Sequence, residues 1–122
     1  MEPTVLIYGV EGAQAKRLRG LFARKNVRAR LVRPEEYGEP VGAMCGARAK
    51  TGAAPDGGEL RAMLVFCRCT TRQLDMLLSE IRTARLCPDA LRAVLTEHNA
   101  AWSGERLCAE LINERGSLES DR

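Results

Sequence analysis

Aromatic side chains and long apolar runs are both scarce in this chain. Phe, Trp and Tyr together make up 4% of the 122 residues, so a buried core has to be built mainly from aliphatic side chains. No apolar run approaches the roughly 18–20 residues of a membrane-spanning helix, and we expect no membrane contact. Residues 1–4 lead directly into a short apolar run without a basic segment, so we expect no secretory leader.

Lysine and histidine are scarce as well. The chain has three lysines and one histidine, and sixteen of its nineteen basic residues are arginine. The net charge is only +3, and acidic residues are interspersed with the arginines. This pattern is typical of a solvated surface of mixed charge rather than a field of one sign. Binding to nucleic acid is therefore not favoured.

The cysteines do not form the pattern of a disulfide framework. Their number is odd, their spacing is irregular, and disulfides are rare in reducing compartments. We expect reduced thiols in a cytoplasmic protein. The five are Cys45, Cys67, Cys69, Cys87 and Cys108.

The length of the chain is that of one domain. We assign residues 1–116 to a single domain and expect a frayed polar tail at 117–122. Residues 47–58 contain three glycines and a proline but no large apolar side chain. This composition predicts a flexible loop.

The middle of the chain has the pattern of a strand, a helix and a second strand. Residues 63–67 are an apolar run with strand character, and residues 90–96 are predicted to form the second strand. Between them, four apolar residues recur at the spacing that places them on one helix face. These are Leu74, Leu77, Leu78 and Ile81.

The remaining elements flank this unit. Residues 5–8 predict a first strand, and residues 13–25 a helix that ends at Asn26 in a left-handed conformation. Alternating apolar and basic residues at 27–32 indicate an edge strand, and residues 103–115 predict a last helix. Alternation of strands and helices favours an α/β fold of three layers. We predict a four-stranded, mainly parallel sheet in the order 2-1-3-4 with about three helices, and a ferredoxin-like α+β fold as the alternative.

A ligand site is expected where the strands of such a sheet end. Ligands of open parallel sheets bind beyond the carboxyl ends of the strands, where the strand order reverses. If all four strands point in one direction, the loops after the first, third and fourth strands meet at one edge. The candidate ligand-binding residues are Tyr8, Gly9, Glu11, Gly12, Cys69, Thr70, Thr96, Asn99 and Trp102.

Local structural roles compete with this assignment. Residues 9–12 lack both the phosphate-loop pattern and the three-glycine dinucleotide fingerprint, and they fit a tight turn before a helix. Thr70 and Gln73 have the spacing of a capping box. Asn99 can stabilise a turn, and Trp102 can cover the core where the last helix docks.

Thiol chemistry is a second interpretation, and it involves Cys67, Cys69 and His98. Residues two apart in a strand face the same side, so the two sulfurs would point in one direction. A structural zinc site takes about four ligands, and with three present we predict no metal. Free buried cysteines usually act as small apolar residues. We assign no catalytic residue and expect no cofactor.

The sequence resembles a small bacterial and archaeal family known only as a domain of unknown function. The most specific part of the resemblance is residues 93–96 followed by Asn99 and Trp102. It implies an uncharacterised domain, supplies no catalytic residues, and does not extend to His98. The other segments that carry it are residues 6–9, residues 64–66, the helix with Leu74, Leu77 and Leu78, and residues 107–114.

These patterns together favour a non-catalytic module that binds a small ligand or a protein partner. The protein partner could be a second copy of the chain, in a homodimer. The alternative is a small thiol-dependent redox protein or enzyme that uses Cys67, Cys69 and His98. A nucleic-acid-associated protein is a weaker alternative.

Overall fold

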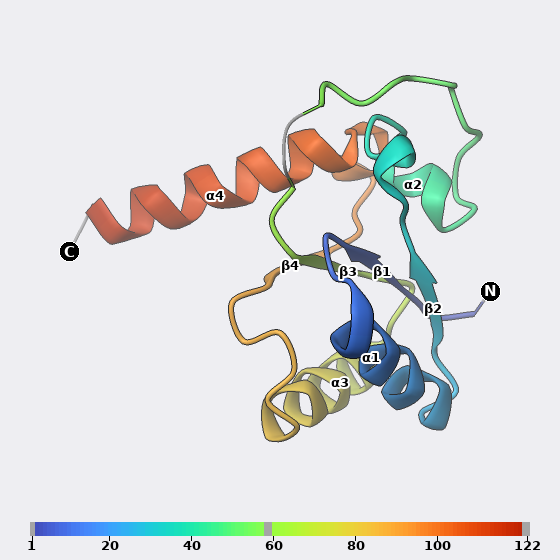
Figure 1. Cartoon of the computed structure of the whole chain (residues 1–122), viewed down its shortest axis with the longest axis vertical. Helices are drawn as coiled ribbons and strands as arrows, with labels where there is room; N and C mark the ends of the chain where they lie inside the picture. The colour runs from blue at the N-terminus through green and yellow to red at the C-terminus, as the bar shows by residue number, and fades with distance from the viewer. Residues whose placement is uncertain (1, 58–59, 121–122) are drawn as a thin grey trace.

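Two β-α-β units form most of the structure (Figure 1). The computed structural model describes residues 2–57 and 60–120, with side chains described through Glu114. The first unit consists of β1 (Thr4–Tyr8), α1 (Gly12–Arg24) and β2 (Arg28–Leu31). The second consists of β3 (Met63–Cys67), α3 (Thr71–Thr83) and β4 (Leu91–Val94). Asn26, just after α1, has a φ of 59°, so the left-handed conformation predicted at the end of this helix is confirmed.

The four strands form one mixed sheet in the order β2-β1-β3-β4. β1 is parallel to β2, and β3 is parallel to β4, so the predicted order and the mainly parallel α/β class are confirmed. The central pair is antiparallel, with Thr4 opposite Cys67 and Tyr8 opposite Met63. The expectation that all four strands point in one direction is therefore wrong. The two parallel pairs also distinguish this sheet from a ferredoxin-like one, whose strands are antiparallel.

The connection between β2 and β3 explains the direction of β3. Parallel neighbours need a crossover that carries the chain back to its starting end. Residues 32–62 instead pass through a 3₁₀ turn, η1 (Pro34–Glu36), and the four-residue helix α2 (Val41–Met44). They then return to the end of the sheet where β2 stopped, because β3 starts opposite the last residue of β1.

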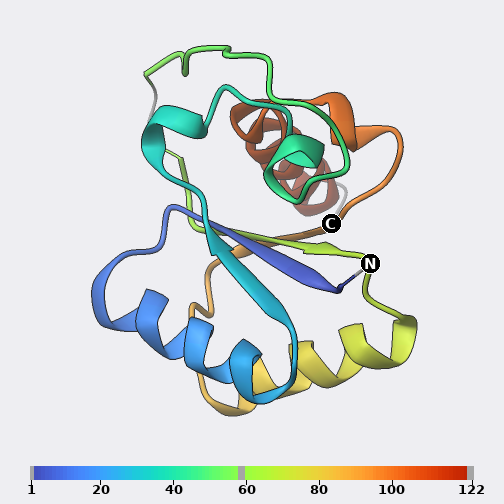
Figure 2. The same cartoon turned by 90° about the vertical axis from the view of Figure 1, so that its right-hand side faces the viewer.

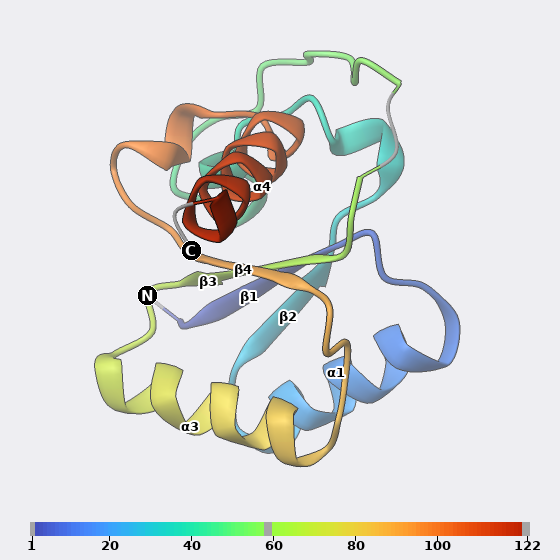
Figure 3. The same ribbon diagram turned by 90° about the vertical axis from the view of Figure 1, so that its left-hand side faces the viewer.

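Helices cover both faces of the sheet and give three layers (Figures 2 and 3). α1 and α3 lie on one face, and α2 and α4 (Gly104–Ser120) lie on the other. The described residues thus contain four helices, against about three expected. The first face buries Val5, Ile7, Leu64 and Phe66 against Leu18, Phe22, Leu77 and Ile81. The second face buries Leu6, Tyr8, Met63, Val65 and Cys67 against Val41, Met44, Leu107 and Cys108.

Carboxylates hold the connection between β2 and β3 against the domain. Glu36 Oε2 accepts hydrogen bonds from Arg30 Nη2 at 2.7 Å and from Lys50 Nζ at 3.1 Å. Glu39 accepts hydrogen bonds from the amides of Thr51 at 2.7 Å and Gly52 at 2.9 Å. Residues 47–57 contain no helix or strand, and these contacts attach that segment to the rest of the chain. Residue 58 of the predicted flexible loop lies outside the described residues.

α4 is longer than the sequence pattern indicated. Its start is capped by Ser103, whose Oγ accepts a hydrogen bond from the Arg106 amide at 3.0 Å. The helix continues to Ser120, five residues beyond the predicted end at 115. Residues 121–122 of the expected tail lie outside the described part of the chain.

Candidate functional site

The predicted site residues do not meet at one edge of the sheet. Because β1 and β3 are antiparallel, the carboxyl end of β1 lies beside the amino end of β3. The loop after β1 is therefore separated from the loops after β3 and β4 by the length of the strands, and the expected meeting of three loops is wrong. The first end carries Tyr8, Gly9, Glu11 and Gly12, and the opposite end carries Cys69, Thr70, Thr96 and Asn99.

At that opposite end, polar side chains stabilise local backbone structure. Thr70 Oγ1 accepts a hydrogen bond from the Gln73 amide at 3.1 Å, and Gln73 Oε1 accepts one from the Thr70 amide at 2.8 Å. The predicted capping box of α3 is therefore confirmed. Asn99 Oδ1 accepts a hydrogen bond from the Thr96 amide at 2.9 Å, and Asn99 Nδ2 donates one to the Val94 carbonyl at 3.1 Å. Both loops are closed by their own side chains.

Trp102 belongs to neither end. It ends the 3₁₀ turn η2 (Asn99–Ala101), and its carbonyl accepts a hydrogen bond from the Val41 amide of α2 at 2.8 Å. The His98 ring contacts the Trp102 ring edge-on, with centroids 5.1 Å apart. Arg106 lies over the Trp102 ring, with Cζ 4.4 Å from its centroid. The three side chains form a small surface stack beside α4.

The two cysteines of the thiol hypothesis face opposite sides of the sheet. Cys67 packs in the core under α4, whereas Cys69 packs against the core under α1 and α3. Arg68 between them has a φ of 61°, which breaks the alternation of the strand, so the prediction that both sulfurs point one way is wrong. Burial raises the pKa of both thiols. Among the described residues, no group of three or more His, Cys, Asp or Glu side chains could hold a metal ion.

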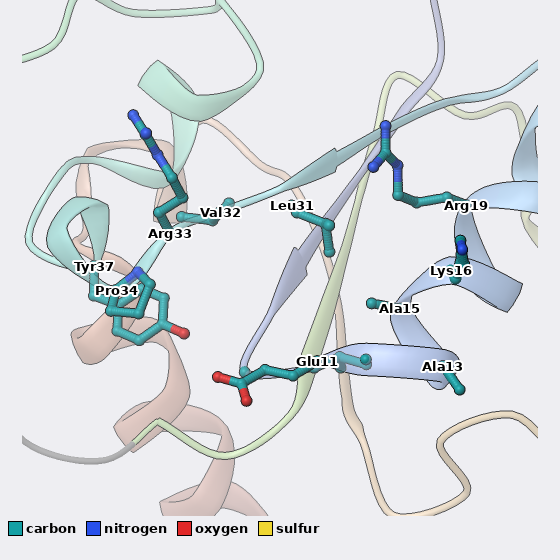
Figure 4. Close-up of a pocket in the computed structure, with 13 residues that line it drawn as sticks. Glu11, Ala13, Ala15, Lys16, Arg19, Leu31, Val32, Arg33, Pro34 and Tyr37 are labelled. Atoms are coloured by element: carbon teal, nitrogen blue, oxygen red, sulfur yellow. The ribbon is translucent and has the colours of Figure 1, made fainter.

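The first end of the sheet contains a cavity of about 720 Å³, which we name the β1–β2 cavity (Figure 4). It lies between the loop after β1, the first turns of α1 and the residues that follow β2. Its apolar surface comes from Ala15, Leu31, Val32 and Pro34. The predicted residues Gly9, Glu11 and Gly12 line it, whereas Tyr8 is buried in the core beneath.

The charged groups of the β1–β2 cavity are arranged by sign. Glu11 extends towards Tyr37 on one side, and Lys16 and Arg19 extend from α1 on the other (Figure 4). In the described part of the chain, none of these three charged groups has an ion-pair or side-chain hydrogen-bond partner. Arg33 also lines the cavity, but its guanidinium forms ion pairs with the carboxylates of Glu35 and Glu36. Glu11, Lys16 and Arg19 therefore remain available to a ligand.

Tyr37 connects the cavity to the core. Burial raises the pKa of the Tyr37 hydroxyl, a hydrogen bond with the backbone of Gly9 lowers it, and the nearby Glu11 carboxylate raises it. The Tyr37 ring packs on the Tyr8 ring with centroids 5.9 Å apart. The hydroxyl thus lies at the cavity wall near the backbone of Gly9, while the ring packs on Tyr8.

A second cavity of about 380 Å³ adjoins the first across the loop after β1. Gly9, Val10 and Glu11 line both cavities. The far wall of the second cavity includes Cys87, whose Sγ donates a hydrogen bond to Gln14 Oε1 at 2.9 Å. The loop after β1 is therefore the shared wall of two hollows at this end of the sheet.

Several cavity residues were absent from the sequence-based site. Lys16 and Arg19 are three residues apart on one helix face, and Arg33 and Tyr37 follow the end of β2. Only the closure of the β1-α1-β2 unit brings the two groups to the same hollow. The available signal was the i, i+3 pair of basic residues beside a turn that carries Glu11. Among the described residues, the cavity lining contains no Ser, Thr, Cys or His, so these side chains supply charged, apolar and phenolic binding groups.

Comparisons with known proteins address the second half of the chain. In the described residues, no helix is both long enough and apolar enough to cross a membrane. Comparison with curated proteins and with solved structures found no match. A family model described as "Domain of unknown function (DUF3783)" matches residues 62–118. The predicted resemblance to an uncharacterised domain family is thus confirmed for this segment, which runs from the start of β3 into α4 and carries a DUF3783 domain of unknown function.

Proposed function

We propose that this chain is a non-catalytic binding module that takes a small polar ligand in the β1–β2 cavity. The observation that carries the proposal is a cavity with an apolar floor and unpaired charged groups at its rim. The five cysteines, all free in the structure, support a reducing, cytoplasmic setting for such a module.

Size and position agree with this function. Ligand cavities in proteins usually occupy about 300–1,000 Å³ and combine mainly apolar walls with a few polar groups, and the β1–β2 cavity measures about 720 Å³. It also lies beyond the carboxyl ends of two parallel strands, β1 and β2, which is the usual ligand position in sheets of this kind.

A screen of the full chain against small polar metabolites by amide NMR tests the proposal. We expect at least one compound to shift the amide signals of residues 9–12, 31–33 and 35–37 in a saturable manner, while the amide signals of residues 96–99 stay in place. A library that shifts no cavity amide, or shifts only those at the opposite end, would overturn the proposal.

We also propose that the chain forms a homodimer through β4. This strand is an edge of the sheet, and an unpaired edge presents free backbone donors and acceptors to another strand. Val94 on β4 is 48% exposed, and Ile112 on α4 is 40% exposed; these are the large apolar side chains exposed in the described residues. α4 passes over β4 and projects beyond the sheet on that side (Figure 1). A second copy is the favoured partner because pairing about a two-fold axis is self-complementary.

Sedimentation measurements test the dimer. We expect the parent to dimerise and Val94→Lys to weaken dimerisation at least tenfold, which corresponds to about 1.4 kcal/mol, because a charge would be placed against the paired edge. Ala23→Lys is the matched control, because Ala23 is exposed on α1, the helix that leads into β2 at the opposite edge of the sheet. A parent chain that remains monomeric at all concentrations overturns the dimer but leaves the ligand-binding proposal unaffected.

A further inference from the structure

The charges at the rim of the β1–β2 cavity are of both signs, which restricts the class of ligand. A ligand that carries only negative charge would be repelled by Glu11, and one that carries only positive charge would be repelled by Lys16 and Arg19. Like charges at close range cost energy, and opposite charges gain it. A neutral ligand would leave all three groups without a partner.

The two signs occupy different sides of the hollow. Glu11 lies beside Tyr37, whereas Lys16 and Arg19 project from α1, and Ala15 and Leu31 lie between the two sides (Figure 4). An ammonium group beside Glu11 would also lie near the Tyr37 hydroxyl, whose oxygen can accept a hydrogen bond from it (Figure 4). The guanidinium of Arg19 can bind a carboxylate through two parallel hydrogen bonds.

Glu11, Lys16 and Arg19 are not neutralised by ion pairs within the described part of the chain. Glu11 is the residue before α1, but its side chain makes no capping hydrogen bond to the helix. In the part of the chain that the structure describes, Lys16 and Arg19 form no ion pair, whereas Arg30, Arg33 and Lys50 all pair with Glu36. The rim therefore contrasts with the neighbouring cluster around Glu36, where opposite charges neutralise each other.

Resting on the ligand-binding function proposed above, we infer that the β1–β2 cavity selects a zwitterion. Its ammonium group binds at Glu11 and Tyr37, its carboxylate binds at Lys16 and Arg19, and an apolar segment between them packs on Ala15 and Leu31. An amino acid with a carbon chain between its two charges, or a short peptide, has this chemistry.

Three probes with the same six-carbon chain test the inference. 6-Aminohexanoate carries both charges, hexanoate only the carboxylate, and hexylamine only the ammonium. In amide NMR titrations of the full chain at constant ionic strength, we expect 6-aminohexanoate to bind at least tenfold more tightly than either control. The shifted amide signals should include those of residues 9–12, 31–33 and 35–37.

Variants that each remove one charge test which residue binds which end of the ligand. Glu11→Gln should weaken the binding of 6-aminohexanoate about tenfold and that of hexylamine similarly, but should not weaken hexanoate, because a repulsive charge is removed. Arg19→Gln should weaken the binding of 6-aminohexanoate and hexanoate, but should not weaken hexylamine, because here too a repulsive charge is removed. Arg17→Gln, an exposed position on α1 outside the cavity lining, is the matched control and should change none of the three. Circular dichroism verifies that each variant is folded.

The outcomes separate this inference from the proposed function. If hexanoate or hexylamine binds as tightly as 6-aminohexanoate, selection for a zwitterion is overturned while ligand binding stands. If none of the three shifts the cavity amides but another metabolite does, the inference alone also fails. If neither these probes nor the metabolite screen shifts the cavity amides, both proposals are lost.

Discussion

At the scale of single residues, Gly104 shows how closely α4 approaches the sheet. A Cβ atom at this position would lie 2.5 Å from Cε2 of Tyr8, whose ring is fully buried. Overpacking of a filled core usually costs about 1–3 kcal/mol. We expect Gly104→Ala to lower the free energy of unfolding by this amount, as measured by urea denaturation.

Gly20→Ala is the matched control, because the same atom is added where space exists. The nearest atom to a Cβ at Gly20 is Arg24 Nη1 at 3.6 Å, and the residue lies inside α1. Replacing a helical glycine with alanine gains about 0.5–1 kcal/mol. Opposite signs for the two substitutions are expected, and a Gly104→Ala protein as stable as the parent would contradict the packing of α4.

We expect removal of the Tyr8 hydroxyl to stabilise the protein. In the described residues this buried oxygen has no hydrogen-bond partner, and burial, followed by the nearby Cys67, raises the pKa of Tyr8 well above its usual value of 10.0. A buried polar group without a partner costs about 1–3 kcal/mol. Tyr8→Phe should therefore raise the free energy of unfolding by up to about that amount.

Tyr37→Phe provides the comparison for Tyr8→Phe. The Tyr37 hydroxyl interacts with the backbone of Gly9 and is only half-buried, so its removal should be neutral or destabilising. Chemical denaturation of the two variants in parallel distinguishes them. If Tyr8→Phe is the less stable protein of the two, the hydroxyl of Tyr8 has a partner in solution.

At the scale of elements, the carboxylates of Glu36 and Glu39 make the segment after β2 sensitive to acid. Burial raises the pKa of Glu36, but the Arg33 amide, Lys50 and Arg30 together lower it below its usual 4.5. The Thr51 amide, followed by that of Gly52, lowers the pKa of Glu39 below the same value. A lowered pKa in the folded state means that the charged form favours folding.

The sign of the pH dependence follows from these shifts. The stabilisation by both carboxylates is fully present above about pH 4.5, the usual value, and is lost as the pH falls through the lower folded-state values. Glu39→Gln should lower the melting temperature at pH 7 and reduce the loss between pH 5 and pH 3. Glu97→Gln, at an exposed loop position, is the control and should change neither the melting temperature at pH 7 nor its loss at acid pH. Thermal melts of both variants at several pH values test this prediction.

Local elements could be predicted because their signals lie within a few residues. The capping box of Thr70 and Gln73, the left-handed Asn26 and the apolar face of α3 each depend on near neighbours. α2 gave no such signal, because four residues are too few for helical periodicity, and its position depends on contacts such as that between Val41 and Trp102. The left-handed Arg68 was equally hidden, so both cysteines were assigned to one face.

At the scale of the whole molecule, strand order was predictable but strand direction was not. All five residues of β1 and all five of β3 are buried, and a strand that is buried along its whole length has no pattern of exposure that would indicate its direction. The direction was set by residues 32–62, whose path returns to its starting end. The candidate site was divided in consequence: the half around Glu11 lies at a cavity, and the half around Asn99 stabilises turns.

The antiparallel pairing of β1 and β3 can be checked in solution. We expect NOE contacts between the α-protons of facing residues, and between residues near Thr4 and those near Cys67, because antiparallel partners bring Cα atoms within about 4.5–5.5 Å. NOE contacts between Thr4 and Met63 would instead show that β1 and β3 are parallel. Glu11 and Cys69, which follow these strands, would then lie at the same end of the sheet.

The central pairing also bears on aggregation. A segment that began at residue 62 would lack β1, so one edge of the apolar strand β3 would be unpaired and exposed. Exposed apolar edge strands pair with strands of other chains. In the whole chain, β1 occupies that edge along five residue pairs. β1 therefore shields this inner edge of the DUF3783 segment from other chains and leaves only the β4 edge open to strand pairing.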